Sequence, residues 1–149
     1  MGDEGKIARI IVRGAPTGVQ KDLVWALLIG QEEASEWVVA AVDGGFQFTE
    51  LASGKVLAAP STDPGAQVAV AVAGAERARW TIRKFDEDDA AAKIEKVDQI
   101  VSGFYTLELA GTGRYLGRSI VEDRSLLPKR VVLLPAGEGE EEPLVIEVR

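Results

Sequence analysis

The sequence predicts an all-β protein, and three observations support this prediction. Short apolar runs rich in Val, Ile, Thr and aromatic residues recur along the chain, and turns containing Gly or Pro separate them. One strand–turn–strand pattern occurs twice, at residues 45–59 and 103–118. Helical periodicity is almost absent. We therefore expect the core to form between strands rather than between helices.

The length of the chain suits a single domain. Its 149 residues are enough to bury a substantial core, and we expect residues 1–149 to form one unit. The sequence contains no cysteine, so disulfide bridges and thiolate metal sites are excluded. Stability must therefore come from packing between the strands.

The pattern that occurs twice predicts two β-hairpins. Residues 45–59 read GFQFTELASGKVLAA, and residues 103–118 read GFYTLELAGTGRYLGR. In both segments apolar residues lead into a turn of small residues, and a second apolar stretch follows. Glycine supplies the positive φ that such turns need.

Each hairpin begins a longer unit of four predicted strands, and a fainter copy of the unit precedes them. We expect the three units at about residues 5–43, 44–86 and 102–149. Outside the two hairpins, the expected strands are 7–13, a short strand near Val19 after a turn at 14–18, 23–29, 36–42, 68–72, 79–85, 130–134 and 143–148.

Twelve short strands in three units predict a β-trefoil with pseudo-three-fold symmetry. In this fold six strands close a barrel and three hairpins cover one end, so each unit buries its apolar face only by joining the others. Trp37, Trp80 and Leu144 occupy corresponding places in the last strands of the units, and we expect all three in the core.

An acidic segment interrupts the repeat between the second and third units. It reads DEDDAAAKIEKVDQ and spans residues 86–99. Its Ala, Lys and Glu residues favour a short helix, whereas its charge favours an exposed loop. We expect a solvated connection.

The charge of the chain argues against two classes of partner. Seventeen Lys and Arg residues stand against 24 Asp and Glu residues, a net charge of −7, and the basic residues are scattered. This distribution is unlike that of a protein that binds nucleic acid or an anionic membrane. No apolar run reaches the roughly 18 residues that span a bilayer, and the N-terminus lacks a signal pattern. We expect a cytoplasmic monomer.

The residues that usually carry enzyme chemistry are missing. The chain has neither His nor Cys, which removes the commonest general base and the Ser-His-Asp and Cys-His arrangements. Its adjacent carboxylates do not have the spacing of a calcium loop. We expect no enzyme activity, no cofactor and no metal.

A carbohydrate-binding module is the alternative from another class. Sugar sites need an exposed aromatic platform beside polar side chains, and the sequence contains no Gln-x-Trp signature. Trp37 and Trp80 are expected in the core, whereas Trp25 is open to either interpretation. Carbohydrate binding therefore stays as the second hypothesis.

The third unit resembles a known family. Residues 113–135, GRYLGRSIVEDRSLLPKRVVLLP, and the closing PLVIEV resemble the C-terminal part of the cospin-type serine protease inhibitors of fungi. Those proteins are Cys-free, cytoplasmic β-trefoils, similar in fold to the mycocypins that inhibit cysteine proteases. The resemblance implies a defensive or regulatory protein that inhibits trypsin-like serine proteases reversibly, binding like a substrate through one surface loop.

The resemblance also implies where the inhibitory loop lies. It points to the connection between the second and third strands of the first unit, where Gln20, Lys21 and Asp22 stand. Lys21 is the only basic residue of that connection, and an Asp at the base of a trypsin-like pocket would bind its ammonium group. As alternatives, Lys21 and Asp22 form a simple polar turn, or Arg77 in a second loop is the specificity residue.

Other basic residues are weaker candidates. Arg79 directly precedes a predicted core residue, and Arg124, Lys129 and Arg130 border a predicted strand, so we interpret Leu-Pro-Lys-Arg at 127–130 as scaffold. Residues 14–18, GAPTG, form either a hairpin turn or a small-residue loop for a papain-like cleft, which leaves cysteine protease inhibition as a lesser alternative. The absence of Asn argues against legumain-type targets.

Overall fold

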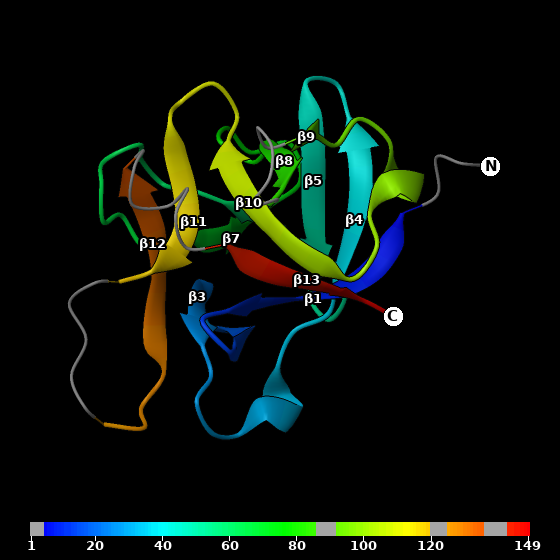
Figure 1. Ribbon diagram of the computed structural model, residues 1–149. Helices are drawn as coiled ribbons and strands as arrows, with labels where there is room; N and C mark the ends of the chain where they lie inside the picture. The colour runs from blue at the N-terminus through cyan, green and yellow to red at the C-terminus, as the bar shows by residue number, and fades with distance from the viewer. Residues whose placement is uncertain (1–4, 86–91, 120–124, 136–142) are drawn as a thin grey trace.

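The protein is all-β, as the sequence predicts. The computed structural model describes residues 5–85, 92–119, 125–135 and 143–149, and strands dominate them (Figure 1). The elements are β1 (Lys6–Val12), β2 (Ala15–Gln20), β3 (Leu23–Ala26), η1 (Gln31–Glu33), β4 (Trp37–Val42), β5 (Gly45–Glu50), β6 (Val56–Ala58), β7 (Ala69–Ala71), β8 (Trp80–Lys84), β9 (Ala92–Lys93), η2 (Val97–Gln99), β10 (Gly103–Leu109), β11 (Arg114–Arg118), β12 (Lys129–Pro135) and β13 (Leu144–Val148).

Six antiparallel strands pair into a closed ring. Strand β1 pairs with β4, β4 with β5, β5 with β8, β8 with β10, β10 with β13, and β13 with β1 again. Closure leaves no open edge among these six strands, which removes a site of unwanted strand pairing.

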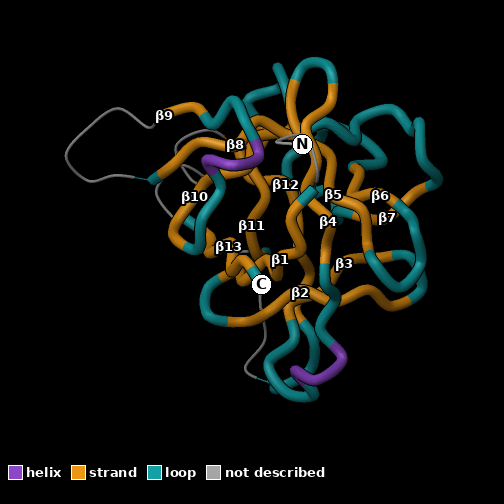
Figure 2. Tube along the Cα trace, turned by 90° about the vertical axis from the view of Figure 1, so that its right-hand side faces the viewer, coloured by secondary structure: helices purple, strands orange, loops and turns teal. Residues whose placement is uncertain are grey.

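Six further strands of the described chain form three hairpins that pair with one another. These hairpins are β2–β3, β6–β7 and β11–β12. Strand β3 pairs with both β12 and β7, and an isolated bridge joins Gln67 to Val132. The hairpins therefore support one another, and loops and turns lie around the outside of the molecule (Figure 2).

The core lies inside the ring and beneath the hairpins. Along β1, β5 and β13 buried residues alternate with more exposed ones, as expected for strands with one face inward. Trp37, Trp80 and Leu144 are all buried, so this prediction is confirmed. The indole Nε1 of Trp37 donates to Thr17 Oγ1 at 3.2 Å, and that of Trp80 donates to the Leu57 carbonyl at 3.1 Å.

Most predicted strands lie within a few residues of the observed ones, but the predicted turn at residues 14–18 is wrong. The chain reverses at Arg13 and Gly14, which have φ of 51° and 80°. Strand β2 then begins at Ala15, and its first four residues are buried. Proline fits here because the first residues of a strand tolerate a missing N–H group.

The expectation of a solvated connection at 86–99 is also wrong for the residues that the structure describes there. Strand β9 pairs with β8, and the backbone N–H of Ile94 donates to the Ile82 carbonyl at 2.8 Å. Ile94, Val97 and Ile100 join the main core. The apolar residues thus anchor the segment while its charged neighbours face solvent. Residues 86–91 lie outside the described part of the chain.

No helix in the described ranges is long and apolar enough to cross a membrane. The two helical elements in these ranges, η1 and η2, are single 3₁₀ turns of three residues each.

Candidate functional site

The candidate inhibitory residues Gln20, Lys21 and Asp22 lie at the tip of the β2–β3 hairpin. Gln20 pairs with Leu23, so Lys21 and Asp22 alone form the turn. Their φ values are 53° and 62°. A two-residue turn with both residues in the left-handed region matches the right-handed twist of the flanking strands. The hairpin is therefore short and tightly closed.

Contacts on both sides hold this turn in place. Asp22 Oδ1 accepts a hydrogen bond from Lys55 Nζ at 2.8 Å, an ion pair with the neighbouring β5–β6 connection. The Asp22 carbonyl accepts from the N–H of Val70 at 2.9 Å. Trp25, half-buried, donates its Nε1 to the Gln20 carbonyl at 3.4 Å. The turn is thus attached to the scaffold by main-chain and side-chain bonds.

Lys21 is the exposed cation of this turn. Its side chain makes no hydrogen bond or ion pair with any residue of the described ranges. Its ammonium group is therefore available to a partner, whereas the Asp22 carboxylate is already engaged by Lys55. The backbone at Lys21 is folded into the turn, not extended as a bound substrate would be.

The second candidate, Arg77, is used by the scaffold. Its Nε donates to the Ala59 carbonyl at 2.9 Å and its Nη2 to the Pro60 carbonyl at 2.7 Å. Its Nη1 lies 3.7 Å from Glu76 Oε2. These bonds hold the guanidinium against the main chain of the loop after β6, on a different hairpin from Lys21. Lys21 and Arg77 therefore do not lie together at one hairpin tip.

The weaker basic candidates also have structural roles where they are described. Arg79 Nη1 donates to the Asp43 carbonyl at 3.1 Å. Lys129, with a relative exposure of 6%, is buried at the start of β12, where it pairs with Ala26. The predicted strand at 130–134 is confirmed as part of β12, which Arg130 enters with its side chain exposed. Arg124 lies outside the described residues.

The papain-cleft alternative at residues 14–18 is contradicted by burial. Ala15 to Gly18 are all buried within β2. A Cβ atom added to Gly18 would lie 2.8 Å from Leu27 Cδ1, so the packing there is close. These residues cannot enter a protease cleft while β2 is formed.

Sequence reasoning missed an exposed apolar loop next to β12. Leu126 and Leu127 have relative exposures of 61% and 66%. Ser125 Oγ accepts from the Leu127 N–H and from Lys129 Nζ, both at 3.3 Å, which ties the loop to the start of the strand. Leucine usually indicates a core, so only its place directly before Pro128, at the end of a loop, could have signalled exposure.

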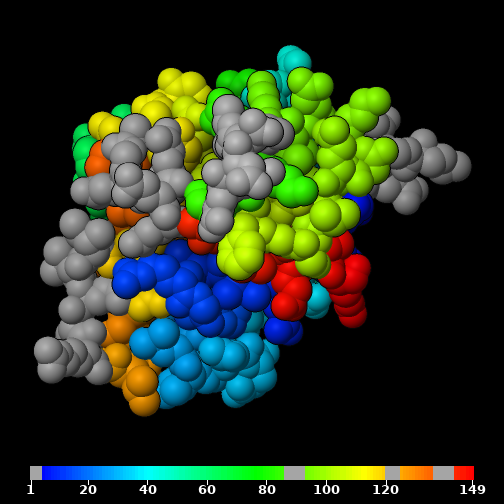
Figure 3. Space-filling view, viewed as in Figure 1, coloured from blue at the N-terminus to red at the C-terminus, as the bar shows by residue number. Residues whose placement is uncertain are grey.

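Another exposed aliphatic residue lies in the segment that leaves the sheet beside this loop. Because Lys129 pairs with Ala26, the residues before β12 and after β3 leave the sheet at the same point. Ile29 is exposed in the segment that follows β3. The two segments lie next to each other at the lower end of the molecule in Figure 3.

The β2–β3 hairpin also borders an acidic hollow of about 380 Å³. Glu50, which lines the hollow but is itself buried, accepts hydrogen bonds from Ser35 Oγ and, at 2.6 Å, from Ser53 Oγ. These bonds hold the β5–β6 turn against the segment before β4. Among the described residues, no group of three or more Asp or Glu side chains is arranged to hold a metal ion.

Comparisons with known proteins support peptidase inhibition and the fold separately. Residues 98–149 match a family model described as peptidase inhibitor I66, which covers about the last third of the chain. A search of curated proteins finds no match.

Solved structures with low sequence identity share the fold. A designed 3-fold symmetric protein, ThreeFoil, superposes with a TM-score of 0.66 at 18% identity, over 95% of this chain and 97% of its own. A ricin B-like lectin from Macrolepiota procera, in complex with lactose, gives 0.67 at 15% identity, over 97% and 96%. The lysenin pore gives 0.61 at 19% identity, and the match covers 97% of this chain but 45% of the pore chain. This chain thus has an all-β fold of the kind found in ThreeFoil and the lectin.

Proposed function

We propose that the protein is a β-trefoil inhibitor of trypsin-like serine proteases and that Lys21 is its specificity residue. The match of residues 98–149 to the peptidase inhibitor model carries the proposal of inhibition. The ring of six strands and the three mutually paired hairpins support the trefoil. The free ammonium group of Lys21 supports the trypsin-like target.

The chemistry of Lys21 suits such a target. An acidic residue at the base of a protease pocket makes a charge-assisted bond with a lysine ammonium group. The Lys21 side chain has no hydrogen bond or ion pair to lose among the described residues. Its entry into the protease pocket therefore costs only the desolvation of its ammonium group and the ordering of its side chain. Asp22 Oδ1 is ion-paired with Lys55 Nζ at 2.8 Å, so the carboxylate that follows Lys21 already has a cationic partner.

The stiffness of the hairpin favours tight binding and slow cleavage. Paired strands hold the turn, so little backbone entropy is lost on association. The positive φ at Lys21 and Asp22 keeps the Lys21–Asp22 peptide bond out of the extended geometry of a substrate. We infer that Lys21 occupies the specificity pocket while the bond that follows it is a poor substrate.

Enzyme titration tests this proposal. The purified protein is titrated against trypsin, chymotrypsin, subtilisin and papain, and the Lys21→Ala variant is measured in parallel. We expect inhibition of trypsin, weakened at least about 100-fold in Lys21→Ala, because a buried charged anchor dominates such interfaces. Lys84→Ala removes another exposed lysine, on β8, and serves as the matched control.

Two results would contradict the proposal at different levels. Equal inhibition of trypsin by the wild type and Lys21→Ala would reject the loop and leave the function standing. Absence of inhibition against all four proteases would reject the function.

The loop of Leu126 and Leu127 offers a second inhibitory site for proteases with an apolar specificity pocket. It lies inside the segment that matches the inhibitor model, whereas Lys21 lies outside it. Two exposed leucines on a loop anchored by Ser125 and Lys129 suit an apolar pocket. If this site acts, Leu126→Ala or Leu127→Ala weakens inhibition of chymotrypsin or subtilisin and leaves inhibition of trypsin unchanged.

The proposed setting is a cytoplasmic monomer with a defensive or regulatory role. Size-exclusion chromatography with light scattering tests the monomer, and localisation of the tagged protein in its own cells tests the compartment. A stable dimer would change which hairpins a protease can reach.

A further inference from the structure

Three neighbouring strands of the ring, β10, β13 and β1, carry an exposed outer surface. They run side by side in Figure 1, and their colours meet on the front of Figure 3. Phe104 pairs with Val145, and Val145 pairs with Ile11, so these three side chains point outward in one row across the strands. Phe104, at the β10 end of this apolar row, has a relative exposure of 58%.

A charged row lies next to the apolar row. Arg9 pairs with Glu147, two residues along β1 and β13 from Ile11 and Val145. Residues two apart on a strand share a face at a spacing of about 7 Å. The aromatic ring and the two charged groups therefore lie on the same outer face. Glu147 is displaced from Phe104 by two residues along the strands and one strand across them, and Arg9 by two residues and two strands.

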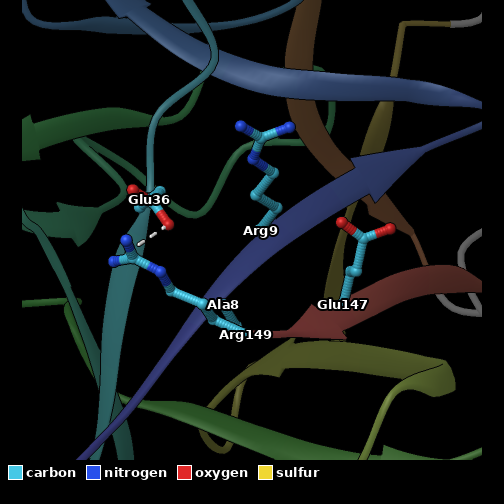
Figure 4. A pocket seen from close by; sticks show the side chains of 5 residues that line it. All are labelled: Ala8, Arg9, Glu36, Glu147 and Arg149. Atoms are coloured by element: carbon cyan, nitrogen blue, oxygen red, sulfur yellow. Dashed lines mark ion pairs between the residues drawn. The ribbon is translucent and has the colours of Figure 1, made fainter.

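The charged groups of Arg9 and Glu147 do not interact with each other. Arg9 and Glu147 are directly opposite, yet they form no ion pair, and neither side chain bonds to any other residue in the described part of the chain. Figure 4 shows both side chains rising from the same side of the sheet with their charged ends apart. They line a hollow of about 310 Å³ together with Ala8, Glu36 and Arg149, where Arg149 Nη1 lies 3.6 Å from Glu36 Oε2.

This arrangement selects a neutral ligand rich in hydroxyl groups. Glu147 opposes an anion, and Arg9 opposes a cation, so neither kind of ion alone satisfies both. A hydroxyl group both donates and accepts, and neighbouring hydroxyls of one molecule can donate to the Glu147 carboxylate and accept from the Arg9 guanidinium. The exposed ring of Phe104 offers an apolar platform for the C–H face of the same molecule.

We propose that the outer face of β10, β13 and β1 is a carbohydrate-binding site, with Phe104 as the stacking platform and Glu147 and Arg9 as the hydrogen-bonding pair. The site lies on ring strands, whereas Lys21 and the Leu126–Leu127 loop lie at a hairpin tip and in a hairpin connection. It does not depend on the proposed protease inhibition, and both activities are compatible on one molecule.

A titration of the ¹⁵N-labelled full chain tests the site. The ligands are lactose, cellobiose and N,N′-diacetylchitobiose, with the zwitterionic dipeptide glycylglycine as a charged comparison. We expect at least one sugar to shift the amide signals of residues 7–11, 102–105 and 145–149. Phe104→Ala should weaken that sugar about ten-fold, and Phe104→Trp should retain binding, because the aromatic face is what binds.

Matched variants show whether sugar binding requires Phe104, Glu147 and Arg9 rather than exposed side chains in general. Glu147→Ala and Arg9→Ala should each weaken sugar binding, while Val72→Ala, which truncates another exposed apolar side chain, should not. Inhibition of trypsin should be unchanged in Phe104→Ala. The proposal is overturned if no sugar shifts these signals, if the shifts map to the hairpins instead, if Phe104→Ala binds as well as the wild type, or if only glycylglycine binds.

Discussion

At the scale of single residues, buried polar contacts determine where substitution is costly. In the described ranges, each fully buried polar side-chain atom has a hydrogen-bond partner. Trp37 and Thr17 form one such pair, with an Nε1 to Oγ1 distance of 3.2 Å inside the core. The pair joins β2 to β4, so it fixes the hairpin that carries Lys21 against the ring.

Replacing Thr17 with Val should destabilise the protein by about 1–3 kcal/mol. The substitution keeps the shape of the side chain but leaves the Trp37 N–H buried without an acceptor. Urea unfolding monitored by tryptophan fluorescence measures the change. Thr62→Val is the control because Thr62 is exposed, and it should change the free energy of unfolding by less than about 0.5 kcal/mol.

At the scale of elements, two positions that are equivalent in the predicted repeat differ in their tolerance to side chains. Gly45 and Gly103 both begin the first strand of a predicted unit, at β5 and β10. A Cβ at Gly45 would lie 2.7 Å from the Trp80 carbonyl oxygen, and Gly45 has φ of 157°. A Cβ at Gly103 would have its nearest contact at 3.8 Å.

Gly45→Ala should therefore cost about 2–3 kcal/mol, because the contact is with main chain that cannot move without breaking the pairing of β5 with β8. Gly103→Ala is the matched control and should be close to neutral. The difference in stability follows from the urea midpoints of the two variants, provided that the free energy of unfolding depends on urea concentration with the same slope in both. Equal losses in both would show that the close approach at Trp80 is relieved by a small shift.

The strands were largely predictable because the alternation of apolar residues is a local property of the sequence. The turn at residues 14–18 was misplaced because Gly and Pro signal a turn wherever they occur, whereas here Pro16 and Gly18 are buried in β2. The burial of Ile94 and Val97 was not predicted, because charged residues surround them in the sequence. Their burial depends on β8 and the core, which no local pattern reveals.

The candidate site was predictable only in part. Resemblance pointed to Gln20, Lys21 and Asp22, and the structure gives them a single hairpin tip. The positive φ of Lys21 depends on the pairing of Gln20 with Leu23, which the sequence did not specify. The surface of Phe104, Glu147 and Arg9 joins residues from both ends of the chain, so only the register of β1, β13 and β10 reveals it.

At the scale of the whole molecule, closure of the ring makes the three predicted units depend on one another. The last strand, β13, pairs with the first, β1, and with β10. Leu144 is buried in the main core, together with residues from all three predicted units. Loss of packing in the last strand should therefore weaken the whole ring and not only its own unit.

Leu144→Ala should lower the free energy of unfolding by about 2–5 kcal/mol through the cavity that it leaves. Far-ultraviolet circular dichroism and tryptophan fluorescence should follow one coincident urea transition in both wild type and variant. Trp37 and Trp80 lie in the first and second predicted units, so fluorescence reports on parts of the chain other than the one that is changed. Separate transitions would show that the units unfold independently.

The pairing of β1 with β13 has a consequence for redesign of the chain. Ala8 lies opposite Val148, and the Arg149 N–H donates to the Ile7 carbonyl at 2.9 Å, so a short linker from residue 149 to residue 5 could join the two strands. New ends could then open between Ile29 and Gln31 without removing any strand pairing of the ring. Such a circular permutant should fold with its Lys21 hairpin intact, because a closed ring of strands has no required starting point.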